Sequence, residues 1–184
     1  ILEGGDVSIN SPNITLSNWV VGRESSEGSA GYLRINSTYL NATSLTVGKQ
    51  GYLRVNSTYM NVTDINAKYT GTVLISTDTL IVEGIDANGV YLWPGGTVLI
   101  SANNLTASSI TANGSEFWNG GKIEINTTTI ERVGTITANR GGGTGSQIHG
   151  TIDITLNNTT LTIPASETIT AGYINIHSAP DIFY

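Results

Sequence analysis

One glycine-led strand pattern recurs along the whole chain of 184 residues and constrains the fold more than any other feature. Each copy has a glycine, a variable residue, an aliphatic residue, a second variable residue and a second aliphatic residue, as in GYLRIN and GTVLIS. Tolerant and apolar positions alternate, which indicates a strand with one buried face. The copies begin at Gly5, Gly31, Gly51, Gly71, Gly96, Gly121, Gly150 and Gly172.

The rest of each copy continues this alternation. Matched apolar sets recur 20 to 25 residues apart, and three of them are Met60, Val62, Ile65 and Ala67, then Leu80, Val82, Ile85 and Ala87, then Leu105, Ala107, Ile110 and Ala112. The spacing predicts three short strands per copy, separated by turns rich in Asn, Ser, Thr and Gly. A repeat of 20 to 29 residues with three strands and no helix is typical of one coil of a parallel β-helix.

We therefore predict one all-β domain over residues 1–184, a parallel β-helix of about eight coils without helical caps. Coils that stack at about 4.8 Å would form a rod roughly 34 Å long. The four prolines lie outside the leading strands, where a missing N–H would break the ladder. The alternative is an antiparallel sandwich, whose strands also recur every 8 to 12 residues. Similarity in register between copies favours the β-helix.

Composition excludes several classes of protein. The formal net charge of −6 argues against nucleic-acid binding, which usually needs a basic face. No cysteine is present, so disulfides and cysteine metal sites are excluded. No apolar run approaches the roughly 18 residues of a membrane span. The first residue is Ile1 rather than Met, which suggests removal of an N-terminal piece, either a secretion signal or part of a trimmed chain.

Two stretches carry a resemblance to a known group. GTVLISANNLTASSITANG and GYLRVNSTYMNVTDIN resemble coils of extracellular adhesin-type β-helices, such as the filamentous-haemagglutinin group, with related repeats in surface proteins of archaea and bacteria. The resemblance covers most of the chain. It implies secretion to the cell surface and a surface or adhesive role, and it carries over no particular functional residue.

The end segments are apolar and show no polar cap. A terminal coil normally needs one, because its core and backbone edge are otherwise exposed. Such tips attract another strand, and a head-to-tail junction propagates as a filament of identical chains. The alternatives are that loops cover the ends or that the chain is a fragment of a longer rod. The self-assembly candidates are Ile1, Leu2, Ile182, Phe183 and Tyr184.

Sequons for N-glycosylation are unusually frequent. Ten of the 18 asparagines begin Asn-x-Ser/Thr, which marks glycan attachment sites on exposed turns of secreted proteins. The competing interpretation is structural, since β-helices stack asparagines along turns and favour threonine on strands. Glycans on adjacent coils would also be crowded. The candidates are Asn13, Asn36, Asn41, Asn56, Asn61, Asn104, Asn113, Asn126, Asn157 and Asn158.

Aromatic residues align between copies and form candidate contact surfaces. Exposed aromatic columns can stack on sugar rings or dock another chain, but they also serve simply to pack loops. The aligned pairs are Tyr32 with Tyr52, Tyr39 with Tyr59, and Trp93 with Trp118.

A catalytic role has one candidate, the aligned carboxylates Glu124 and Asp153, which could lie roughly 5 Å apart as in a retaining glycosidase. The surrounding loops are short for a cleft, so we predict no enzyme activity. We also expect no cofactor and no metal, because His149 and His177 share no short ligand spacing.

The sequence thus predicts a secreted, glycosylated structural protein whose main partner is its own copy, with cell-surface glycans as a further candidate partner. The alternatives are a monomeric adhesin or carbohydrate-binding module and, third, a polysaccharide-active enzyme.

Overall fold

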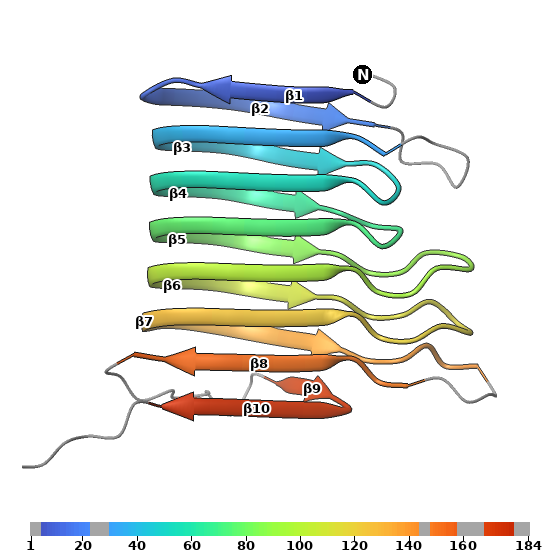
Figure 1. The fold of residues 1–184 in the computed structure, drawn as a ribbon. Coiled ribbons are helices and arrows are strands. Elements are labelled where there is room, and N and C mark those ends of the chain that lie inside the picture. Colours follow the sequence, from blue (N-terminus) through green and yellow to red (C-terminus); the bar gives the residue numbers. More distant parts are fainter. Residues whose placement is uncertain (1–4, 23–29, 144–147, 158–167, 179–184) are drawn as a thin grey trace, which may run out of the picture.

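Ten parallel strands stack along one axis in the computed structural model (Figure 1). The structure describes residues 5–22, 30–143, 148–157 and 168–178, and no helix occurs among them. The strands are β1 (Asp6–Asn10), β2 (Asn13–Val21), β3 (Tyr32–Val47), β4 (Tyr52–Asn66), β5 (Thr72–Asp86), β6 (Thr97–Thr111), β7 (Lys122–Ala138), β8 (Thr151–Leu156), β9 (Ile169–Ala171) and β10 (Tyr173–Ser178). The predicted all-β parallel β-helix is confirmed.

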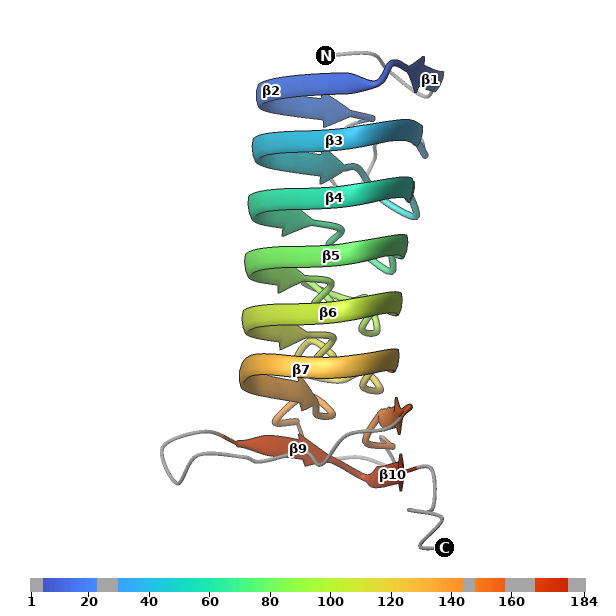
Figure 2. The same cartoon turned by 90° about the vertical axis from the view of Figure 1, so that its left-hand side faces the viewer.

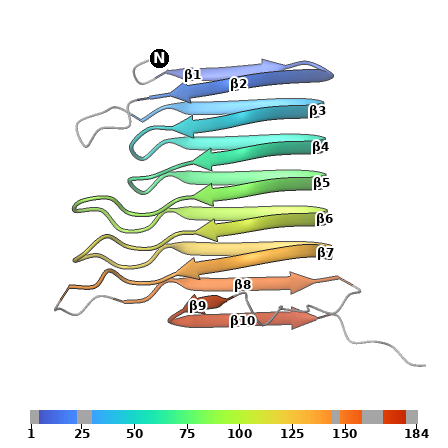
Figure 3. The same ribbon diagram turned by 180° about the vertical axis from the view of Figure 1, so that it is seen from behind.

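The leading strands pair in the register that the sequence repeat predicts. Their order is β1-β3-β4-β5-β6-β7-β8-β10, while β2 pairs with β3 and β9 pairs with β7. The leading glycines form a column, in which Tyr52 N donates to Gly31 O and Thr72 N donates to Gly51 O, both at 2.8 Å. Each coil thus lies directly on the next, as the views from the side and from behind show (Figures 2 and 3).

The three predicted strands of a coil are arms of one continuous, bent strand. Between β3 and β4, Ser37 pairs with Ser57 and Tyr39 pairs with Tyr59, so the ladder skips one residue at the first bend. A second skip follows the pairing of Ala42 with Val62. The same interruptions recur between β4 and β5 and between β5 and β6. The backbone remains extended through both bends, so the three arms form one uninterrupted strand.

Aliphatic columns fill the interior. One column, from the first arm, has no solvent exposure at any member and consists of Leu33, Leu53, Val73, Val98, Ile123 and Ile152. Full burial of such a side chain stabilises the fold by about 1.5–3 kcal/mol relative to exposure. Since like residues stack on like, the apolar core runs the length of the described rod.

Small polar residues line the first bend. Thr77 and Thr127 are buried, and each hydroxyl donates to backbone carbonyls, Thr77 to Thr58 and Thr127 to Thr129. These bonds satisfy polar groups that would otherwise be costly to bury. The bend therefore keeps its shape without interrupting the core.

Candidate functional sites

The last leading strand, β10, exposes its apolar positions. Ile152 and Ile154 in β8 are fully buried, but their register partners in β10, Ile174 and Ile176, are 41% and 44% exposed. Strand β10 stands at the end of the sheet order and pairs with β8 on one side. These isoleucines belong to the last copy of the sequence repeat. The self-assembly candidates predicted from the sequence lie instead in the end segments of the chain.

The opposite end of the sheet order is β1, which pairs with β3 (Figure 1). Val7 and Ile9 are partly buried against the core. On the outer face, Asp6 forms an ion pair with Arg34 at 3.5 Å. The five sequence-predicted assembly residues, Ile1, Leu2, Ile182, Phe183 and Tyr184, lie outside the described residues.

The sequon asparagines fall into two groups according to what their side-chain amides bind. Asn36 Nδ2 donates to Asn10 Oδ1 and Asn157 Nδ2 donates to Asn126 Oδ1, both at 2.7 Å. Asn113 is half-buried, and its Nδ2 donates to Thr137 Oγ1 at 2.9 Å. These three amide nitrogens therefore already serve the stacking of coils. They support the structural interpretation of part of the sequon pattern.

At the other sequons within the described ranges, Nδ2 makes no hydrogen bond to another coil, and most of these asparagines are exposed. Asn41 and Asn61 are register partners, and together with Thr43 and Thr63 they line a shallow groove of about 150 Å³. Asn104 is half-buried, and Asn158 lies outside the described residues. The exposed members of this second group are Asn13, Asn41, Asn56, Asn61 and Asn126.

Two of the three aligned aromatic pairs are in ring contact. The Tyr32 and Tyr52 centroids lie 6.2 Å apart, as do those of Tyr39 and Tyr59. Such tilted pairs contribute roughly 0.5–1.5 kcal/mol beyond their burial. They stiffen neighbouring coils from outside the core.

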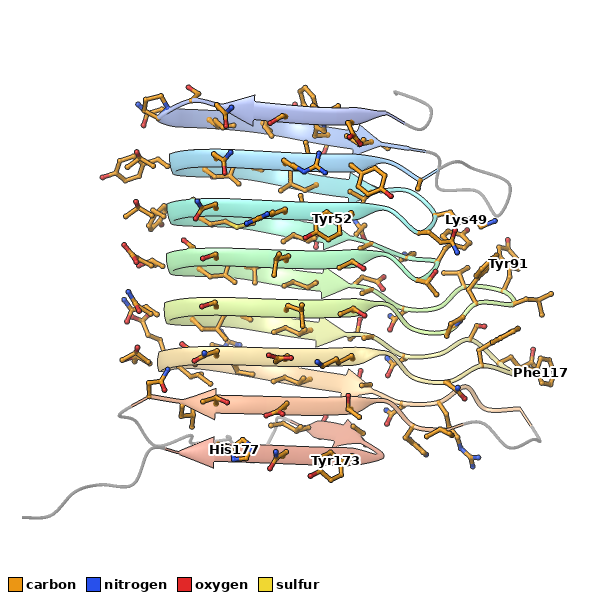
Figure 4. All side chains as sticks on the ribbon, in the orientation of Figure 1. Lys49, Tyr52, Tyr91, Phe117, Tyr173 and His177 are labelled. Atoms are coloured by element: carbon orange, nitrogen blue, oxygen red, sulfur yellow. The ribbon has the colours of Figure 1, made fainter. Side chains whose placement is uncertain are left out.

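The aligned tryptophans lie in stacked corner loops. Ser115 donates from both its backbone N and its Oγ to Trp93 O, and Gly141 N donates to Trp118 O at 3.0 Å. Trp118 is 41% exposed, while Trp93 is half-buried beneath Lys49, whose Nζ lies 4.5 Å from the ring centroid. Exposed Tyr91 and Phe117 lie on the same loop side of the rod (Figure 4).

The two aligned carboxylates occupy neighbouring positions, since Glu124 and Asp153 are register partners. Glu124 Oε2 pairs with Lys122 Nζ at 2.7 Å, and Asp153 Oδ1 lies 3.8 Å from His177 Nε2. Their side chains are 50% and 41% exposed. The pair thus lies on an open outer face. Within the described ranges no three His, Asp or Glu residues are grouped so as to hold a metal.

A pocket that the sequence did not predict lies beside the corner loops. It has a volume of about 320 Å³, and its described lining is Thr46, Val47, Asn66, Lys68, Tyr69 and Val90. Tyr69 stacks on Tyr91 with centroids 6.5 Å apart and planes 24° apart. No sequence signal identifies it, because its walls come from three coils and from a turn whose shape is set by packing.

Comparison with known proteins assigns this chain to no family. Family models, curated proteins and solved structures were each searched, and none matches this chain. Its described residues include no helix with the length and apolarity to cross a bilayer. The fold and the geometry of the sites therefore carry the functional argument.

Proposed function

We propose that this chain is a structural subunit of an extracellular filament and assembles head to tail, with β10 of one copy pairing in parallel with β1 of the next. The observation that carries the proposal is the exposure of Ile174 and Ile176 in register with fully buried isoleucines. Burial of each would stabilise a junction by about 1–2 kcal/mol, because nearly half of each side chain is still in contact with water.

The repeat supplies the register for this junction. Both β1 and β10 follow a glycine, so alignment of Gly172 with Gly5 places Ile174 beside Val7 and Ile176 beside Ile9. The inner columns would then continue from copy to copy as they do between β8 and β10. A heterologous contact of this kind does not close, so it propagates a fibre. Among the described residues each of these two strands pairs on one side, and the backbone groups of its other edge would supply the hydrogen bonds of the junction.

We further propose that the chain is secreted and has a surface role, as is typical of the adhesin-type group that the repeats resemble. We propose that N-glycans occupy exposed sequons whose Nδ2 makes no coil-to-coil bond, led by Asn56 and Asn13. A glycan on Asn36 would instead compete with its bond to Asn10. The rod in this account is structural rather than catalytic.

Electron microscopy of dilute protein tests the assembly. Wild-type protein should form fibres, and the double variant Ile174→Lys, Ile176→Lys should remain monomeric because two ammonium groups would enter the junction core. Asn175→Lys is the control, since it adds one positive charge to β10 on the opposite face, outside the junction core, and should form fibres. Unfolding midpoints of monomers show whether the double variant is folded. Fibres of the folded double variant would refute the proposal.

A further inference from the structure

We infer that the pocket beside the corner loops binds one acidic saccharide unit, a pyranose ring that carries a carboxylate. The site is independent of the filament junction, because its walls come from the third arms of β3 and β4 and from the corners that follow β4 and β5. Lys49 and Tyr91, next to it in the fold, project on the loop side of the rod (Figure 4).

The size and lining of the pocket suit one sugar ring. Its volume of about 320 Å³ is at the small end of ligand pockets, which are usually 300–1,000 Å³. Val47, Val90 and the Tyr69 ring offer apolar contact, whereas Thr46, Asn66 and Lys68 offer hydrogen bonds. A pyranose needs both kinds of surface, since its C–H face packs on aromatic rings and its hydroxyls need polar partners.

Thr46 gives the pocket an unused polar group. Thr46 is only 5% exposed, and its hydroxyl makes no hydrogen bond with the described residues, but Oγ1 is not among the buried polar atoms that lack a partner, so it is not sealed from solvent. Elsewhere in the rod, the buried Thr77 and Thr127 both bond to carbonyls. A ligand hydroxyl in the pocket would replace water as the hydrogen-bond partner of this group.

The wall of the pocket is held in a strained conformation. Tyr69 and Thr70 have φ values of 60° and 63°, and Tyr91, which stacks on Tyr69, has a φ of 56°. For a β-branched residue such as Thr70 the left-handed region is a true outlier, and each such residue costs about 1–3 kcal/mol. Strain of this kind is typical of ligand-binding positions. Here it positions Tyr69, which lines the pocket and stacks on Tyr91.

Charge favours an acidic ligand. The described lining contains one cation, Lys68, and no carboxylate, although the whole chain has a net charge of −6. Lys68 Nζ is paired at 3.1 Å with Asp86, outside the lining, and its side chain remains 44% exposed. A sugar carboxylate could therefore bind Lys68 from the pocket side, and a charge-assisted bond of this kind is about twice as strong as a neutral one.

Titration with glucuronic acid, and with methyl glucoside as the neutral probe, tests the site by ligand-observed NMR. The Ile174→Lys, Ile176→Lys monomer serves as host, so that assembly does not affect the result. Glucuronic acid should bind more tightly than the glucoside, and Lys68→Gln should abolish that preference. Val90→Trp should abolish the binding of both probes. Tyr59→Ala, in an aromatic pair outside the pocket, should leave the binding of both probes unchanged.

The inference is overturned if glucuronic acid does not bind to the host, or if it binds equally to the host and to a folded Val90→Trp variant. If Val90→Trp does not fold, Lys68→Gln decides the question, because it removes charge without filling space. An unchanged preference for glucuronic acid in that variant would contradict an acidic-sugar site.

Discussion

The backbone nitrogen of Thr97 donates to the carbonyl oxygen of Gly71 at 3.0 Å, which places the glycine-led segments of β5 and β6 directly on one another. The same bond recurs from Lys122 to Gly96 and from Thr151 to Gly121. Glycine is needed at Gly71 because the backbone of the corner that leads into it passes too close for a side chain. A Cβ on Gly71 would lie 2.9 Å from the Ala67 Cβ and closer still to the Ala67 carbonyl.

Gly71→Ala should therefore destabilise the rod by about 1–3 kcal/mol, the usual cost of overpacking. Gly142→Ala is the matched control, because a Cβ there would meet no atom within 4 Å. The midpoint of denaturant unfolding should be lower for Gly71→Ala than for Gly142→Ala. Equal midpoints would show that close packing at the glycine column does not limit stability.

Two neighbouring serines should respond differently to alanine. Ser37 and Ser57 are register partners at the first bend, but Ser37 Oγ is buried without a partner, whereas Ser57 Oγ donates to Thr77 Oγ1 at 3.2 Å. Ser37→Ala should be neutral or stabilise by up to about 1 kcal/mol, and Ser57→Ala should cost about 1 kcal/mol. Thermal unfolding checks the sign, and a loss of stability for Ser37→Ala that matches Ser57→Ala would contradict this account.

Thr70→Gly should separate stability from ligand binding. Glycine adopts the left-handed region without steric cost, so the free energy of unfolding should rise by about 1 kcal/mol, less the greater entropy of the unfolded chain. The relaxed turn should hold Tyr69 less firmly and weaken glucuronic acid binding severalfold. Denaturation and the NMR titration together give both values. Tighter binding in the variant would show that the strain does not serve the pocket.

Glycan occupancy should follow the bonding of Nδ2. In chains from a glycosylating host, peptide mass spectrometry should find Asn56 and Asn13 occupied more often than Asn36 and Asn113, whose amides bind other coils. Asn41 and Asn61 are register partners about 4.8 Å apart, so both should rarely carry a glycan on one molecule. Equal occupancy at Asn36 and Asn56, or an unmodified protein, would contradict the proposal.

The sequence alone predicted the register of the fold, because each coil repeats the same local rule. The alignment of Leu33, Leu53 and Val73 follows from period-two alternation after a glycine, and the structure stacks them as expected. The continuity of the strands through the bends was not predicted. Asn, Ser and Thr at a bend read as turn residues, although the backbone there stays extended.

The sites were less predictable because they depend on neighbours one coil away. Asn36 and Asn56 stand in the same sequence context, yet only the amide nitrogen of Asn36 donates to the coil before it. The sequence does not distinguish the two. Likewise, the left-handed turn at Tyr69 and Thr70 uses residues that rarely adopt it, so only the packing of adjacent coils reveals the pocket. Ile174 and Ile176, in contrast, were visible as the last repeat copy.

Cysteine pairing across the junction tests the central claim, that β10 of one copy lies in register on β1 of the next. The chain has no cysteine, and residues 8 and 175 lie at opposite ends of the sheet order, roughly 34 Å apart at about 4.8 Å per strand, so they cannot join within one chain. Chains with Ser8→Cys and Asn175→Cys should form a ladder of disulfide-linked multimers on oxidation. The pair Ser8→Cys with His177→Cys, two residues out of register, should form few. No ladder from the first pair in fibre-forming protein, or equal ladders from both, would contradict the account.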